Sequence, residues 1–214
     1  MVYYTALGDS ITAGRSATSP RYAYPSLIVQ SLQQQRRGAQ GCVFAHDGWT
    51  SGALAGALPF GLEAIRRATT VSIWVGGNDL LRAAISLAVG SAHFQSVLVN
   101  RLARYASNLE QIVNAVRANS SACIVLCTQY NPFPRSPVAV AAIQQLNGAT
   151  IQRSKALSTE LAPAHEWFEG NQPALIQGYH TGRVEDALAS FRRPIHPNNA
   201  GHAVIARNLS AYIR

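Results

Sequence analysis

The chain has 214 residues, of which 48% are apolar and 13% charged, and its 18 basic and 10 acidic side chains give a formal net charge of +8. This composition suffices for one buried core and excludes an intrinsically disordered chain. No apolar run approaches the roughly 18 residues of a membrane span. The basic pairs are scattered and lack interleaved aromatic residues, so we expect neither a membrane span nor a nucleic-acid partner.

Apolar runs alternate with amphipathic stretches along the whole chain. Strands are predicted at Val2–Leu7, Cys42–Ala45, Thr70–Val75, Ala122–Thr128 and, as a short last strand, Ala164–Phe168. Helices are predicted at Tyr22–Arg37, Leu54–Ala68, Phe94–Ala118, Val138–Leu161 and Asn199–Ile213. Because parallel strands need crossover connections, this alternation predicts an α/β fold, a parallel sheet with helices on both faces. No linker or repeat divides the chain, and we expect a single domain over residues 1–214.

The cysteines and the first residues give little information on the compartment. Cys42, Cys123 and Cys127 are odd in number, and the last two are too far apart in one strand to bridge, so we interpret all three as reduced thiols. No signal peptide is visible. A cytoplasmic protein and the mature form of a secreted protein both fit.

Three polar strings each follow or precede an apolar run: Gly8-Asp9-Ser10, Gly76-Gly77-Asn78-Asp79 and His196-Pro197-Asn198. A serine at the carboxyl end of a parallel strand lies where open α/β sheets bind ligands. An asparagine after paired glycines can aim its NH₂ group at a developing oxyanion, which contributes about 3–4 kcal/mol in known sites. Each string alone also fits a helix cap or a structural histidine. Together they predict a nucleophile, an oxyanion donor and a base.

With Gly48 in Asp47-Gly48-Trp49-Thr50-Ser51, these strings resemble the four ordered signature blocks of the SGNH hydrolases, also called GDSL esterases/lipases. The resemblance implies a flavodoxin-like three-layer α/β/α sandwich, with a five-stranded parallel sheet of order 2-1-3-4-5. It also implies that Ser10 is the nucleophile and His196 the general base. The oxyanion hole would consist of the Ser10 and Gly48 backbone N–H groups and the Asn78 side chain, with Gly52 as a rival to Gly48.

Apolar residues next to the strings are candidates for the substrate pocket, although ordinary packing explains them equally well. They are Ile11, Trp49, Leu80, Leu81, Tyr130, Phe133 and Ile195. The histidine and cysteine spacings suit no metal, and no nucleotide-binding glycine loop is present, so we expect no metal and no other cofactor. The expected partner is a small carboxylic ester, hydrolysed through an acyl-enzyme. The alternative is a catalytically impaired ligand or glycan binder on the same fold.

The region before the histidine departs from the family pattern. Family members commonly carry Asp three residues before the histidine, and this chain has Arg193 there. Arginine has only donors and cannot accept the Nδ1–H of His196. The favoured interpretation is a Ser-His dyad in which a backbone carbonyl near Arg193 or Pro194 orients the ring. In the second, a carboxylate arrives from elsewhere, with Asp186 or Glu185 nearest in sequence. The third is the impaired binder.

Overall fold

The computed structural model describes residues 1–35, 38–81, 94–189 and 193–214. Its strands are β1 (Val2–Gly8), β2 (Ala39–Ala45), β3 (Thr70–Trp74), β4 (Cys123–Cys127) and β5 (Glu160–Ala162). All four strand pairings are parallel, and the order is β2-β1-β3-β4-β5. The predicted α/β fold and strand order are therefore confirmed.

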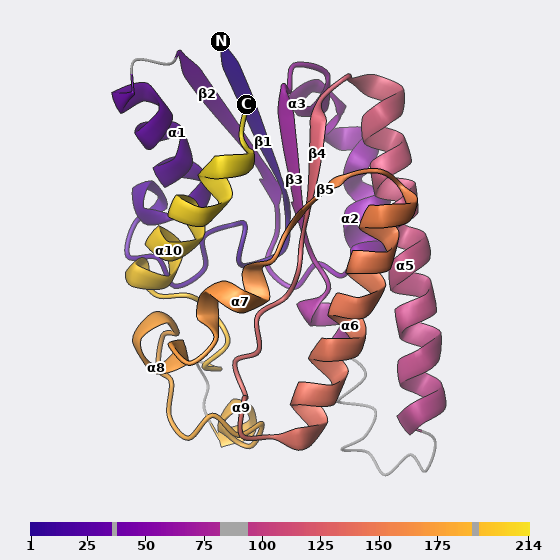
Figure 1. Cartoon of the computed structure of the whole chain (residues 1–214), viewed down its shortest axis with the longest axis vertical. Coiled ribbons are helices and arrows are strands. Elements are labelled where there is room, and N and C mark those ends of the chain that lie inside the picture. Colours follow the sequence, from indigo (N-terminus) through magenta and orange to yellow (C-terminus); the bar gives the residue numbers. More distant parts are fainter. Residues whose placement is uncertain (36–37, 82–93, 190–192) are drawn as a thin grey trace.

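Helices cover both faces of the sheet (Figure 1). One layer contains α1 (Tyr24–Gln34) and α10 (Asn199–Leu209), and the other contains α2 (Ser51–Ala57), α3 (Leu62–Arg66), α5 (Phe94–Asn119) and α6 (Pro137–Ala156). Short helices α7 (Ala164–Phe168), α8 (Gln172–Leu175) and α9 (Asp186–Ala189) lie toward the end of the sheet opposite the chain termini. Single 3₁₀ turns occupy Pro20–Tyr22, Leu58–Phe60 and Ser210–Tyr212. None of the helices in the described ranges is long and apolar enough to cross a bilayer.

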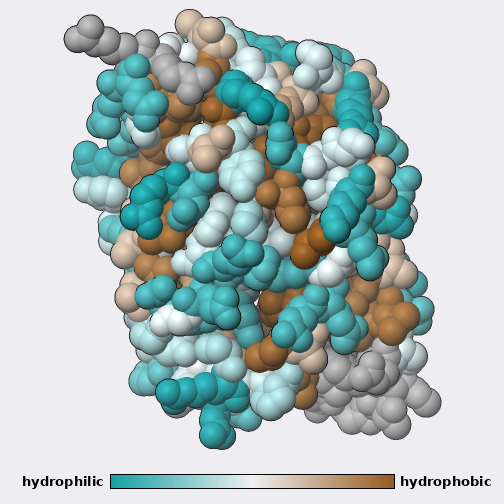
Figure 2. All heavy atoms as spheres, in the orientation of Figure 1, coloured by the Kyte–Doolittle hydropathy of each residue, from teal (hydrophilic) through white to brown (hydrophobic). Residues whose placement is uncertain are grey.

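Each face of the sheet has its own apolar core. Ile28 of α1 and Ile205 of α10 are fully buried on one face, and Leu54 of α2 and Ile112 of α5 are fully buried on the other. Each such side chain contributes about 1.5–3 kcal/mol relative to exposure. The face of the molecule seen in Figure 2 contrasts with these cores, since its apolar residues lie among hydrophilic ones.

The strand register places the polar strings at one edge of the sheet. Gly8 at the end of β1 pairs with Trp74 at the end of β3, so the segments that follow both strands leave the sheet side by side. A Cβ at Gly8 would lie 2.4 Å from the Trp74 carbonyl oxygen and 2.1 Å from Thr12 Oγ1. Glycine is therefore required by this close approach.

Two predicted elements differ from the structure near β5. The predicted strand at Ala164–Phe168 is wrong, because these residues form α7. The last strand is instead Glu160–Ala162, and the predicted helix Val138–Leu161 includes its first two residues. Helix α6 ends at Ala156, and Ser158 then takes a left-handed φ of 48° that turns the chain back toward β4.

The predicted helix at Leu54–Ala68 is divided into α2, a 3₁₀ turn and α3. Its start is earlier than expected because Thr50 Oγ1 accepts the Ala53 N–H and caps α2. Pro59 and Gly61 then interrupt the helix, because proline lacks a backbone N–H and glycine has a low helix propensity.

His202 joins α10 to the rest of the fold. Its ring is completely buried and stacks on Tyr24 with centroids 6.3 Å apart. The Tyr24 backbone N–H donates to Nδ1 at 3.4 Å, so the ring proton lies on Nε2, which is 3.3 Å from the Arg15 carbonyl oxygen. Burial lowers the pKa of His202 to about 4.

This pKa predicts a pH-dependent contribution to stability. Below pH 6.5 the unfolded chain protonates at this histidine while the folded chain does not, so folding stability falls as the pH drops from 6.5 toward 4. We expect the stability advantage of wild type over His202→Gln to shrink by about 1.4 kcal/mol per pH unit in that window. Urea unfolding of both proteins at pH 7, 6 and 5 measures it, and a constant difference would contradict this account.

Candidate active site

Ser10 lies on a tight turn directly after β1. The Asp9 carboxylate accepts the Ile11 N–H at 3.0 Å, and the Ser10 carbonyl accepts the Arg15 N–H at 2.9 Å. These bonds fix the turn without using the Ser10 N–H, which has no acceptor within the described residues. The side chain is 8% exposed. The turn thus presents both a hydroxyl and a free backbone N–H at the edge of the sheet.

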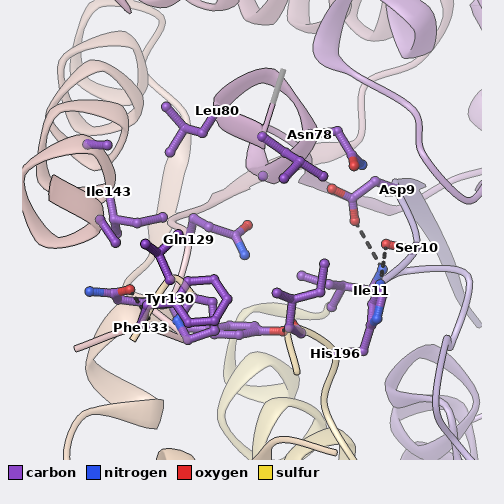
Figure 3. A pocket seen from close by; sticks show the side chains of 18 of the residues that line it. Asp9, Ser10, Ile11, Asn78, Leu80, Gln129, Tyr130, Phe133, Ile143 and His196 are labelled. Carbon is purple, nitrogen blue, oxygen red and sulfur yellow. Dashed lines mark hydrogen bonds between the residues drawn. The ribbon is translucent and has the colours of Figure 1, made fainter. Parts of the chain in front are cut away.

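The structure brings His196 to Ser10. The ring nitrogen Nε2 of His196 is 2.9 Å from Ser10 Oγ, within hydrogen-bonding distance, and Figure 3 shows the pair at one end of a cavity. Burial, followed by the positive charge of Arg15, lowers the pKa of His196 to about 4. The ring is therefore neutral near pH 7, which leaves a nitrogen able to take the serine proton.

Main-chain contacts hold the segment that carries His196. Tyr130 donates its hydroxyl proton to the Ile195 carbonyl at 2.6 Å, and the Gln177 N–H donates to the His196 carbonyl at 2.9 Å. On the other side, Asn198 Oδ1 accepts the Gly201 N–H and caps α10. The histidine is thus positioned through its backbone on both sides.

Neither predicted acceptor reaches the second ring nitrogen of His196. The Arg193 carbonyl accepts the Ile195 N–H at 2.8 Å instead, and both Asp186 oxygens are occupied by Thr181 and Gly182. Within the described residues no hydrogen bond to Nδ1 is formed, and no buried side-chain nitrogen or oxygen there lacks a partner. Among the described residues neither Arg193 nor Asp186 is hydrogen-bonded to Nδ1, and orientation of the ring by a carbonyl or a carboxylate stays a prediction.

Asn78 and Gly48 are connected through Trp49, which lies in the loop between β2 and α2. Asn78 Nδ2 donates one proton to the Trp49 carbonyl at 3.0 Å, which leaves its second N–H for another acceptor. Gly48 precedes Trp49 with a left-handed φ of 79°, and its N–H has no acceptor among the described residues. The rival Gly52 lies inside the first turn of α2, beside Asn108.

Asp79 connects the segment after β3 to the start of α2. Its carboxylate accepts the Ser51 N–H at 2.9 Å and the Ser51 hydroxyl at 2.7 Å, so it binds the start of α2. Burial raises the pKa of Asp79, although the Ser51 hydrogen bonds oppose this effect. Burial likewise raises the pKa of Asp9 to about 7, and the charge of Asp79 adds to the shift. The edge of the sheet is therefore poorly solvated, which strengthens electrostatic interactions there.

A cavity of about 150 Å³ opens beside Ser10 and His196. The predicted residues Ile11, Leu80, Leu81, Tyr130, Phe133 and Ile195 line it. Trp49 does not, because it packs on Phe44 and His46 with ring centroids 5.4 Å and 5.7 Å away.

Sequence reasoning missed one wall of this cavity. Val138, Ala139, Ala142 and Ile143 form the wall contributed by α6, which we had read only as a helix. Gln129 was also missed, although a polar residue shortly after a strand is the same signal that singled out Ser10 and Asn78. Across the described ranges, no group of three or more His, Cys, Asp or Glu side chains is arranged to hold a metal.

Comparisons with known proteins agree with the fold and point to one family. The model of the GDSL-like lipase/acylhydrolase family matches residues 6–204. The chain is 26% identical to the spore germination lipase LipC of Bacillus licheniformis, over 97% of this chain and 94% of that protein. Two solved structures share the fold: the lipase Lip_vut3 from a goat rumen metagenome and an extracellular lipase from Streptomyces rimosus. Lip_vut3 matches with a TM-score of 0.79 at 23% identity, and the match covers 100% of this chain and 99% of Lip_vut3. The Streptomyces rimosus lipase matches with a TM-score of 0.73 at 19% identity, and the match covers 99% of this chain and 100% of that lipase.

The contact between Tyr130 and Ile195 generates a prediction. Tyr130→Phe retains the ring but frees the segment before His196, so we expect Ser10 to react about tenfold more slowly with a fluorophosphonate, a loss of about 1.4 kcal/mol. The rate constant of labelling, followed by mass spectrometry, measures this effect. Tyr4→Phe is the matched control, because it removes an equally buried hydroxyl that bonds Ser72 at 2.7 Å. Equal slowing in both variants would contradict a positioning role for Tyr130.

Proposed function

Because this chain belongs to the GDSL-like lipase/acylhydrolase family, we propose that it hydrolyses small carboxylic esters through an acyl-enzyme on Ser10. The single observation that carries this mechanism is the 2.9 Å contact between Ser10 Oγ and His196 Nε2. It supports a catalytic pair in which His196 is the base for Ser10. The chain is an esterase or lipase by family, and the residue roles that follow are our proposal.

In the first step Ser10 Oγ attacks the ester carbonyl while His196 Nε2 takes its proton. The tetrahedral intermediate carries a negative oxygen. Three N–H groups without other acceptors are proposed to bind that oxygen: the Ser10 and Gly48 backbone N–H groups and the second Nδ2–H of Asn78. Such preorganised donors act strongly in a poorly solvated site.

In the second step His196 returns its proton to the alkoxide, and the alcohol leaves. A water molecule then attacks the acyl-serine, with His196 again as the base, and the acid is released. Among the described residues no carboxylate is hydrogen-bonded to the imidazolium that forms twice in this cycle. Water at Nδ1 is proposed to stabilise it, and we therefore expect a dyad that is slower than a full triad.

The cavity supports a small acyl group as substrate. Its volume of about 150 Å³ lies below the range of 300–1,000 Å³ that is common for drug-sized ligands. Apolar side chains of α6 and the segment after β4 form most of its wall. A short apolar acyl chain would be desolvated there.

Replacing Ser10 distinguishes the proposed esterase from the alternative, a non-catalytic binder. We expect Ser10→Ala to lower the turnover of p-nitrophenyl butyrate by at least about 10³-fold, because the covalent route is lost. Initial rates on purified proteins, with circular dichroism as the folding control, measure the change. Equal rates in wild type and variant would instead favour a ligand or glycan binder.

The pKa of His196 predicts the acid limb of the rate profile. A general base must be neutral, and burial and Arg15 hold this pKa at about 4, so kcat/KM should fall only as the pH drops through about 4. We expect Arg15→Gln to move that limb upward, because it removes a positive charge while Asp47 remains.

Activity measured from pH 3 to 8, with recovery at pH 7 as the test for denaturation, checks the profile. A limb near pH 6.5 in wild type would contradict a buried, desolvated base. A limb near pH 7 that disappears in Asp9→Asn would assign the controlling ionisation to Asp9.

A further inference from the structure

One polar side chain interrupts the apolar wall of the cavity. Gln129 lies two residues after the end of β4, is 6% exposed and lines the cavity together with Leu80, Phe133 and Ile143. A buried amide among apolar groups is costly unless its donors and acceptors are satisfied. Its contacts therefore indicate what the cavity is built to receive.

The orientation of this amide is fixed by its neighbours. The Trp74 indole N–H can only donate, and it lies 3.0 Å from the side-chain oxygen Oε1 of Gln129. The Gln129 backbone N–H donates to Asn147 Oδ1 at 2.7 Å, and the Gln129 carbonyl accepts from Asn147 Nδ2 at 2.8 Å. With Oε1 and the main chain both anchored, the NH₂ group faces away from Trp74.

That NH₂ group points into the cavity. Figure 3 shows the end of the Gln129 side chain extending into the space between Asp9 and Tyr130. Nε2 donates to no acceptor within the described residues, and no side-chain nitrogen or oxygen there is both buried and unpartnered, so Nε2 borders open space. A Cβ built on Gly77 would lie 3.7 Å from Nε2, which places this donor next to the residue that precedes Asn78.

The cavity thus presents a fixed, unused donor close to the proposed oxyanion hole. Asp9 also lines the cavity and is 2% exposed. An ionised Asp9 would repel a carboxylate on the bound acyl chain, which disfavours an anionic chain. A neutral oxygen has no such penalty and can accept from Nε2.

We propose that the acyl pocket selects acyl groups that carry a neutral oxygen acceptor, an ether, ketone or ester carbonyl, which accepts a hydrogen bond from Gln129 Nε2. This inference rests on the proposed ester hydrolysis and names the acyl class that the same site prefers. A plain alkyl chain leaves the donor unpaired in an apolar wall, and sites built to bond a polar group discriminate against analogues that lack it.

A series of p-nitrophenyl esters tests the proposal. It comprises the pentanoate and the two analogues in which the methylene at C3 or at C4 is replaced by an ether oxygen, the ethoxyacetate and the 3-methoxypropanoate. The enzymes are wild type, Gln129→Met, which has similar length and no donor, and Gln129→Glu, which keeps an acceptor for Trp74 but has no NH₂ group. Dividing each wild-type ratio of kcat/KM by the variant ratio cancels the intrinsic reactivity of the esters.

We expect one ether isomer to be favoured over pentanoate by about fivefold to tenfold in wild type relative to each variant, the size of one neutral hydrogen bond. Gln129→Glu, assayed well above pH 7 so that the introduced carboxyl is ionised, should disfavour that isomer most, because its second carboxylate oxygen then faces the ether oxygen. If Gln129→Met does not fold, Gln129→Glu and the wild-type series decide.

Ratios within about twofold for every isomer, with pentanoate still hydrolysed by wild type, would overturn the proposal and leave Gln129 as a solvated donor. A different result marks failure of the ester-hydrolase mechanism itself: no pentanoate turnover by wild type above Ser10→Ala. That outcome would overturn both.

Discussion

The contact between Ser10 Oγ and His196 Nε2 joins two residues that are 186 positions apart in the chain, and most of the structure around it serves to hold these two atoms. Ser10 is fixed by the end of β1 and by the turn that Asp9 closes. His196 is fixed by the start of α10, because Asn198 caps that helix two residues later. The parallel sheet makes the contact possible, since its strands all end at one edge.

In the part of the chain that the structure describes, the histidine is held by its main chain, and its second ring nitrogen forms no hydrogen bond. Tyr130 binds the carbonyl that precedes it, and Gln177 binds its own carbonyl. A carboxylate on Nδ1 would both orient the ring and stabilise the imidazolium. Backbone anchoring provides orientation alone. The result is a low pKa, caused first by burial and then by Arg15, and a base that remains neutral in mild acid.

Much of the fold and part of the site could be predicted from the sequence, for identifiable reasons. Ser10, Asn78 and His196 stand in short strings beside strand and helix boundaries, where local pattern is informative. The acceptor at Nδ1 and the α6 wall depend on distances between segments that are not neighbours in sequence, and no local pattern encodes them. Trp49 illustrates the same limit, because its neighbours Phe44 and His46 turn it away from the cavity. β5 was misplaced because a strand of three residues is too short to show a recognisable alternation of apolar and polar residues.

The central claim is that a neutral His196, with its proton on Nδ1, accepts a hydrogen bond from Ser10 at Nε2. Nitrogen-15 NMR of the histidine rings at pH 7, with Ser10→Ala and His196→Gln for assignment, tests it most directly. The account predicts a neutral His196 whose Nε2 is unprotonated and whose Nε2 signal shifts in Ser10→Ala. A proton on Nε2, or an imidazolium at pH 7, would contradict the account, because that nitrogen could then take no proton from the serine.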